Sequence, residues 1–90
     1  MFTVTAALTA AQLLSFCTES SEVSAANCSS YIVGVAEADL RSVCLPENSV
    51  YAQLVTEFVT KAKAEAPAVL IQMPAAAYLR AQWAENHPCP

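Results

Sequence analysis

The sequence predicts an all-α fold, a small disulfide-stapled antiparallel bundle of about four helices. Apolar residues recur at three- and four-residue steps in several segments, which is the period of a helix with one buried face. The connections are short, no segment alternates between apolar and polar residues as a strand does, and the chain has one glycine. Residues 1–90 form a single domain, small enough to benefit from covalent links or a partner subunit.

The first helix has a clear start signal. Residues 1–8 show no period and are expected to form a loose N-terminal arm. Thr9 and Gln12 then match a capping box, in which the threonine hydroxyl accepts a hydrogen bond from the Gln12 backbone N–H and the glutamine side chain reciprocates. This box predicts a short helix that runs to about Cys17.

The central helix is predicted to begin near Cys28 and to end before Cys44. Residues 18–26, rich in serine and glutamate, predict a connecting loop, with a recognition loop as the alternative and Ser24 as the helix cap. One broad apolar face of the helix comprises Tyr31, Ile32, Val35, Ala38 and Leu40. Gly34 lies in its middle and costs about 1 kcal/mol relative to alanine. We interpret this glycine as a point of close approach by another helix; the alternative is a tolerated glycine without a packing role.

A turn and a third helix follow. Residues 45–49 predict the turn, because Pro46 disfavours helical geometry in the residue before it and the Asn and Ser side chains satisfy the backbone locally. The helix covers residues 50–66. Its core stripe comprises Leu54, Val55, Phe58, Val59 and Ala62. On its solvent side, Glu57 and Lys61 have the spacing of an intrahelical ion pair.

The last part of the chain predicts a fourth helix. Pro67 ends or kinks the third helix, and the apolar run 68–73 is either a buried turn or a short helix. Pro74 suits the first position of the fourth helix, because its missing N–H would have no intrahelical partner. The helix then covers residues 75–86. The residues expected to be buried include Ala76, Leu79, Ala81 and Trp83.

The four cysteines predict two disulfides, with free buried thiols as the alternative. No C-x-x-C pair occurs, and the spacings fit no zinc finger or ribbon. Of the three connectivities we expect Cys17–Cys28, which joins the end of one helix to the start of the next, and Cys44–Cys89, which ties the tail to the turn. Disulfides imply an oxidising compartment such as the periplasm. Met1 is then interpreted as a start placed on a mature sequence whose signal peptide has been removed.

Composition and charge exclude several classes of function. A net charge of −4 argues against nucleic acid or an anionic membrane as partner, and no apolar run is long enough for membrane insertion. No glycine-rich phosphate loop and no metal cluster is found, and the one histidine, His87, is interpreted as structural or solvent-exposed, so we expect neither an enzyme nor a cofactor. Apolar residues reach 56% and charged residues only 13%, which favours self-association as a homodimer. The function class that remains is a binding or inhibitory protein.

The order of four motifs resembles the Rap/Tai family of type VI secretion immunity proteins. These are C-x10-C-S-S-Y-I-V-G-V-A-E-A, V-C-L-P, Y-A-Q-L-V and H-P-C-P, spread over residues 9–89. The positions that match are Cys28, Tyr31, Ile32, Gly34, Val35, Cys44, Pro46, Gln53, Leu54, Pro88 and Cys89. The residues singled out as structural are Tyr31, Gly34, Pro46 and Trp83.

The resemblance implies a periplasmic helical protein, often a dimer, that binds a cognate peptidoglycan amidase delivered by a type VI secretion system and blocks its catalytic cleft. One alternative is a small periplasmic acid-stress chaperone, which would need a denser set of carboxylates than the eight present. Another is a structural subunit of an envelope complex.

Two segments are candidates for entering the cleft of such an amidase. The turn 45–49 is restrained by the bridge at Cys44 and the cap at Ser49, so it would lose little conformational entropy on binding. Its expected partner-binding residues are Leu45, Glu47, Asn48 and Ser49. The rival is the segment 67–74. Its apolar anchors would be Leu70, Ile71 and Met73. Burial in the core explains these anchors at least as well, and helix faces are the third option.

Overall fold

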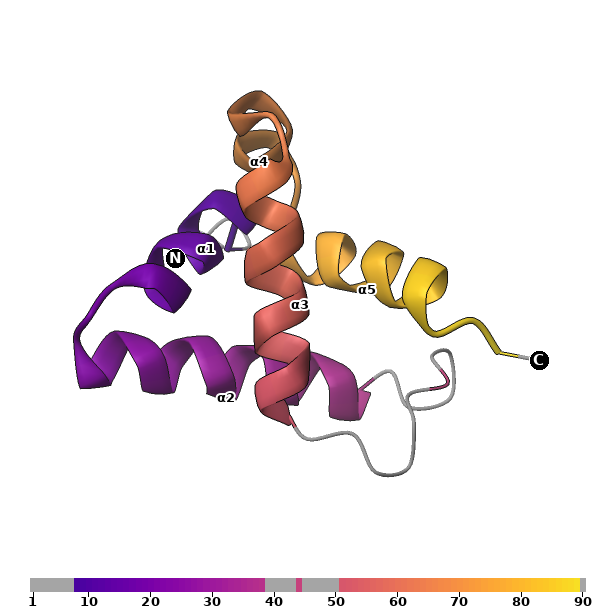
Figure 1. The fold of residues 1–90 in the computed structure, drawn as a ribbon, viewed down its shortest axis with the longest axis horizontal. Coiled ribbons are helices and arrows are strands. Elements are labelled where there is room, and N and C mark those ends of the chain that lie inside the picture. The colour runs from indigo at the N-terminus through magenta and orange to yellow at the C-terminus, as the bar shows by residue number, and fades with distance from the viewer. Residues whose placement is uncertain (1–7, 39–43, 45–50, 90) are drawn as a thin grey trace, which may run out of the picture.

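The computed structural model describes residues 8–38, 44 and 51–89, and this part of the chain folds into five α-helices. They are α1 (Ala10–Thr18), α2 (Glu22–Ala38), α3 (Tyr51–Ala64), α4 (Pro67–Gln72) and α5 (Ala75–Asn86). Figure 1 shows α3 crossing α2, with α4 at the far end of α3 and α5 to one side. The predicted all-α, disulfide-stapled fold is confirmed.

The core lies where α1, α2, α3 and α5 meet. Its largest fully buried side chains are Trp83, Phe58, Leu13, Ile32, Leu54, Leu79, Gln82 and Cys28. The rings of Phe58 and Tyr78 pack edge to face with centroids 5.8 Å apart, which joins α3 to α5. The predicted stripe of α3 is confirmed, since Leu54, Phe58 and Ala62 are buried and the two valines beside them are half-buried.

Helix α1 begins as the sequence predicts. The Thr9 hydroxyl accepts a hydrogen bond of 3.1 Å from the Gln12 backbone N–H, and the Gln12 side chain accepts one of 2.9 Å from the Thr9 N–H. The residue before the box, Leu8, is half-buried and packs against the core. The expected loose arm therefore ends before Leu8, and residues 1–7 lie outside the described part of the chain.

Helix α2 begins earlier than predicted. It starts at Glu22, so most of the expected loop 18–26 is helical, and Ser24 is not its cap. The carbonyl and hydroxyl of Ser21 accept hydrogen bonds from the backbone N–H groups of Ala25 and Ser24, which is how the first turn is satisfied. Ser24 is buried, and its hydroxyl donates to the Glu19 carboxylate.

The outward face of α2 differs from the prediction at two positions. Gly34 is exposed, and a Cβ built on it would meet nothing within 4 Å. The expected close approach of another helix is therefore wrong within the chain, where Gly34 has no neighbour to pack against. Ala36 is buried in place of Ala38, which is exposed, because the core side of α2 follows four-residue steps from Cys28 through Ile32.

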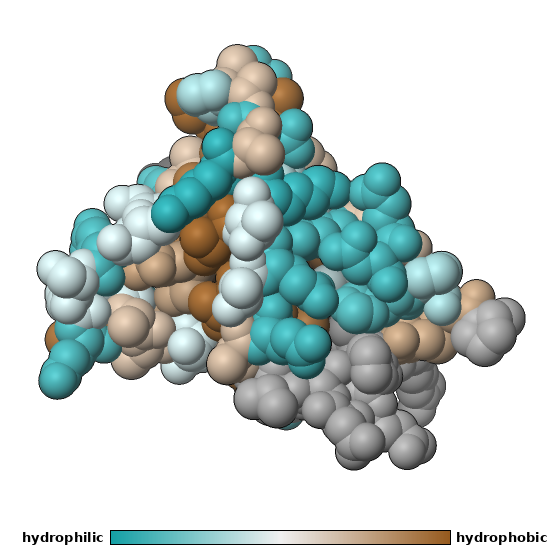
Figure 2. Space-filling model, viewed as in Figure 1, coloured by the Kyte–Doolittle hydropathy of each residue, from teal (hydrophilic) through white to brown (hydrophobic). Residues whose placement is uncertain are grey.

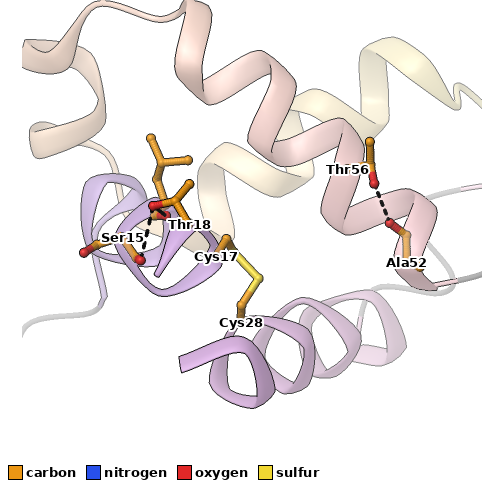
Figure 3. Close-up of a disulfide and its surroundings, with 7 residues drawn as sticks. Ser15, Cys17, Thr18, Cys28, Ala52 and Thr56 are labelled. Atoms are coloured by element: carbon orange, nitrogen blue, oxygen red, sulfur yellow. Dashed lines mark hydrogen bonds between the residues drawn. A yellow bond between two sulfur atoms is a disulfide. The ribbon is translucent and has the colours of Figure 1, made fainter. Parts of the chain in front are cut away.

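Two disulfides join elements that are separated in sequence, with the predicted pairing. Cys17 at the end of α1 is bonded to Cys28 in α2, and their Cα atoms lie 5.0 Å apart (Figure 3). Cys44 is bonded to Cys89, 45 residues later, with the Cα atoms 4.9 Å apart.

The run 68–73 forms a short helix, one of the two alternatives expected. Pro67 stands in the first turn of α4, and Pro74 directly precedes α5. Within α5 the predicted burial of Leu79 and Trp83 is confirmed, whereas Ala81 is exposed. The face of α5 that packs on α3 instead includes Tyr78 and Gln82, which are one helical turn apart.

Candidate partner-binding surfaces

The first candidate surface is the α4 tip, residues 66–73, which is fixed to the body at its C-terminal end. The Ala10 backbone N–H donates a hydrogen bond of 2.9 Å to the Met73 carbonyl, and the Ala75 N–H donates one of 2.7 Å to the Leu8 carbonyl. These two bonds form an isolated antiparallel bridge between Thr9 and Pro74. The backbone after α4 is therefore held in place.

The α4 tip buries one side chain and exposes two large apolar ones. Leu70 packs into the core and is 5% exposed, whereas Val69 is 39% and Ile71 63% exposed. Residues 66–73 carry no charged side chain. Figure 2 shows brown, hydrophobic atoms beside paler ones at this end of the molecule, at the top of the view; a brown strip also follows α3, and the surface to its right, over α5, is mostly teal. The tip is thus an apolar projection on a restrained backbone.

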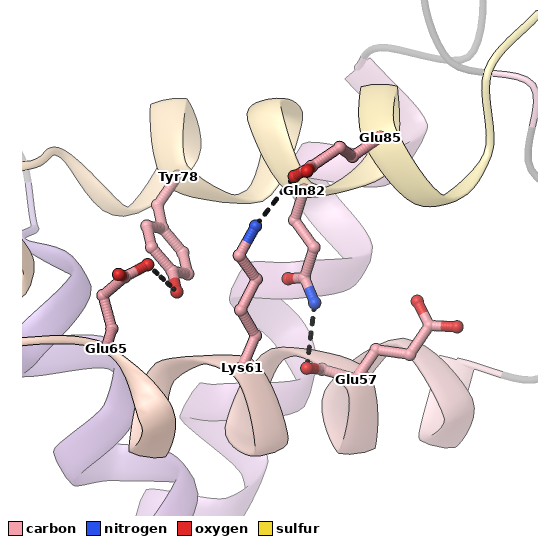
Figure 4. Close-up of polar contacts among 6 residues, drawn as sticks. All are labelled: Glu57, Lys61, Glu65, Tyr78, Gln82 and Glu85. Carbon is pink, nitrogen blue, oxygen red and sulfur yellow. Dashed lines mark hydrogen bonds and ion pairs between the residues drawn. The ribbon is translucent and has the colours of Figure 1, made fainter.

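The second candidate surface is the α3–α5 groove, an open depression of about 750 Å³ between these two helices. Its lining residues are Ala52, Gln53, Thr56, Glu57, Thr60, Lys61, Gln82 and Asn86. Figure 4 shows Gln82 reaching from α5 to α3 between Lys61 and Glu57. Its Nε2 donates a hydrogen bond of 2.9 Å to the Glu57 carbonyl oxygen. Apart from Ala52, the groove is lined by hydroxyl, amide and charged side chains.

Polar side-chain pairs connect α5 to α3 along the groove. Lys61 Nζ donates to Glu85 Oε2 at 3.0 Å, so the intrahelical pair expected between Glu57 and Lys61 is not the contact that Lys61 makes. Glu57 instead faces the His87 ring, with Oε1 3.1 Å from Nε2. The i, i+4 spacing permits an ion pair between Glu57 and Lys61 within α3. Packing against α5 instead gives each of these side chains a partner from the C-terminal part of the chain.

At the other end of the α3–α5 contact, the Tyr78 hydroxyl donates a hydrogen bond of 3.1 Å to Glu65 Oε1. Burial raises the pKa of Tyr78 to about 12, and the hydrogen bond and negative charge of Glu65 act in the same direction. The phenol therefore stays protonated at neutral pH and acts as a structural donor.

The comparison with protein families indicates what kind of protein carries these surfaces. The family described as Rap1a immunity proteins matches residues 9–89, which include all five helices and both disulfides. The chain belongs to the Rap1a immunity protein family. Membership implies that this immunity protein binds a cognate effector. No curated protein and no solved structure matches the chain.

The sequence-predicted site residues of this immunity protein fall in three groups. Leu45, Glu47, Asn48 and Ser49, together with Pro46, lie outside the described residues. The rival segment lies on α4, where Leu70 is buried, Met73 is half-buried and Ile71 is exposed. Of the structural residues, Trp83 is fully buried and Tyr31 half-buried. The sequence reasoning missed the groove, although Gln82 lies one turn from Tyr78 and could have been assigned to the α3 side of α5.

Two further observations concern the described part of this Rap1a family member. No group of three or more His, Cys, Asp or Glu side chains is placed there to hold a metal ion. None of its helices combines the length and the apolar composition that crossing a membrane requires.

Proposed function

We propose that this chain binds and inhibits a cognate peptidoglycan amidase, an effector of a type VI secretion system, and so protects the producing cell. The observation that carries the proposal is the match to the Rap1a immunity proteins over residues 9–89. The chain acts by occupying a surface of the amidase and needs neither catalysis nor a cofactor. The two disulfides suit an oxidising compartment. The periplasm, which also holds the peptidoglycan substrate, is therefore the proposed location.

The α4 tip is the proposed element that enters the amidase cleft. Ile71 and Val69 supply apolar surface, and the hydrogen bonds to α1 fix the backbone that carries them. Such a restrained projection loses little conformational entropy on binding, so more of the contact energy appears as affinity. The turn 45–49, with Leu45, Glu47, Asn48 and Ser49, remains a second proposed contact.

A homodimer is the proposed form of the free protein. Gly34 lies exposed on α2 without a neighbour in its own chain, so the backbone of a second helix has room to approach it. Val23 on the same helix is 70% exposed. We therefore place the dimer contact on the outward face of α2, away from the α4 tip. Light scattering at high micromolar concentration tests this directly, since a monomer mass would contradict it.

The proposed inhibitory contact is tested by replacing Val69 and Ile71 with serine together. Both side chains are exposed, so the fold should persist, and loss of a true hot spot should weaken binding to the amidase by about 2 kcal/mol or more, about 30-fold. Titration calorimetry measures the affinity. Ala81→Ser is the matched control, because it introduces serine at an exposed position of α5 that belongs neither to the α4 tip nor to the outward face of α2.

A second arm replaces Glu47 and Asn48 with alanine. If the first double variant binds as the wild type does and the second does not, the turn 45–49 and not the α4 tip makes the decisive contact. Full affinity in both would remove both segments from the proposed interface.

A further inference from the structure

The two disulfides differ in how far a reagent in solution can reach them. Cys28 is 2% exposed and Cys17 is half-buried, so their bridge lies between α1 and α2 against the core. Cys44 and Cys89, in contrast, are both exposed. A thiolate opens a disulfide by direct attack on one of its sulfur atoms, so the rate depends on access to that atom. The Cys44–Cys89 bridge is therefore accessible in the folded protein, whereas the packing of α1 on α2 covers the other bridge.

Contacts that precede Cys89 in the chain keep α5 in place without the exposed bridge. Trp83 and Tyr78 are buried in the core. At the end of the helix, the His87 backbone N–H donates a hydrogen bond of 2.7 Å to the Trp83 carbonyl, and His87 Nε2 lies 3.1 Å from Glu57 Oε1 on α3. Opening the bridge therefore removes the covalent link at Cys89 and leaves the helices packed.

We propose that the Cys44–Cys89 bridge is a thiol–disulfide exchange site, which a dithiol opens while Cys17–Cys28 stays oxidised. One thiolate of the dithiol attacks a sulfur of the bridge and forms a mixed disulfide, and the cysteine that leaves takes up a proton. The second thiol of the reagent loses its proton and attacks the mixed disulfide, which releases the other cysteine and closes the reagent's own disulfide. Two electrons and two protons pass in this way from the dithiol to the bridge.

The test is reduction of the oxidised full chain by dithiothreitol at about pH 8, where part of the reagent is thiolate, and without denaturant. Free thiols are trapped with N-ethylmaleimide at successive times, and peptide mapping locates the label. Cys44 and Cys89 should become labelled at least about tenfold faster than Cys17 and Cys28. Labelling of all four cysteines at one rate, or faster labelling of Cys17 and Cys28, would overturn the proposal.

Thr9→Ala is the variant that separates direct attack from attack after unfolding. It weakens the cap of α1 and touches neither cysteine of the exposed bridge. Direct attack on the folded protein predicts that Cys44 and Cys89 are labelled at the wild-type rate. If the bridge opened only in the unfolded chain, the loss of the cap would raise that rate about fivefold, and this result would contradict the proposal.

Trp83 reports whether the fold survives the opening. It is the one tryptophan in the chain and is fully buried, so its fluorescence follows the packing of α5. The form labelled only at Cys44 and Cys89 should keep the emission maximum of the oxidised protein, and a shift to the emission of the unfolded chain would contradict the proposal. Neither the exchange nor its test involves the amidase, so this proposal and the proposed function can fail separately.

Discussion

The backbone N–H of Ala10, in the first turn of α1, donates a 2.9 Å hydrogen bond to the carbonyl of Met73, at the end of α4. The same stretch of chain provides the capping box, since Thr9 precedes Ala10 and bonds Gln12. The start of α1 thus stabilises its own helix and also fixes the segment that carries Ile71. A helix of six residues is not stable by itself, so α4 depends on these contacts with the rest of the fold for its restraint.

Replacing Thr9 with alanine should lower the free energy of unfolding by about 1 kcal/mol, because the Gln12 backbone N–H loses its hydroxyl acceptor. Urea unfolding followed by circular dichroism measures the change. Thr60→Ala is the control, since Thr60 is exposed in the middle of α3 and caps no helix. Equal stability of the two variants would show that the capping box contributes nothing.

Replacing Gly34 with alanine should raise the free energy of unfolding by about 0.5 to 1 kcal/mol, because alanine loses less backbone entropy in a helix and its methyl group meets no neighbour. The measurement is urea unfolding at low protein concentration, where a dimer contact does not contribute. A loss of stability under these conditions would contradict the exposed position of Gly34.

Local signals in the sequence were sufficient to place α1, α3 and α5. The Thr9 capping box and Pro74 mark two helix starts, and the stripe through Phe58 identifies the core side of α3. The disulfide pairing was predicted from cysteines expected at helix ends. Cys17 does lie at the end of α1, whereas Cys28 lies inside α2, so the pairing was right although one of its premises was not.

The remaining features depend on tertiary contacts. Ser21 and Ser24 are equally good caps by residue type, and the start of α2 is decided by the contact of Ser24 with Glu19. Helix α5 is rich in alanine, so its apolar residues do not define one face, and packing on α3 selects Gln82 for burial in place of Ala81. The α3–α5 groove also arises from the packing of α5 on α3, and no sequence motif marks it.

The stability of the protein should depend on pH at alkaline values through Tyr78. Its pKa of about 12 in the fold lies above the ordinary value of about 10, which is expected in the unfolded chain. Tyr78 therefore makes its full contribution to the free energy of unfolding below about pH 10. That contribution is lost as pH rises towards 12, because the phenol of the unfolded chain releases its proton at a lower pH than that of the folded chain. Urea unfolding between these pH values measures the loss. Tyr78→Phe should remove it, and an identical pH dependence in that variant would assign the effect to other groups.

Replacing Cys44 and Cys89 together with serine should lower the free energy of unfolding by about 4 kcal/mol, because a bridge over 45 residues restricts the unfolded chain strongly. Both cysteines are exposed, so the serines disturb little packing. Cys28 is fully buried, so Cys17 and Cys28, 11 residues apart, are replaced with alanine instead, and the loss of their bridge contributes about 3 kcal/mol. Urea unfolding of both double variants gives the two values, and an unchanged midpoint for either variant would show that its bridge does not stabilise the fold.

Inhibition of the cognate amidase tests the proposed immunity function most directly. The enzyme to test is any secreted amidase that the neighbouring genes encode, and its release of peptides from purified peptidoglycan is measured with increasing amounts of the oxidised protein. The account predicts that hydrolysis stops at an equimolar ratio, while an unrelated amidase is unaffected. Hydrolysis that continues at its full rate in a large excess of this protein would contradict it.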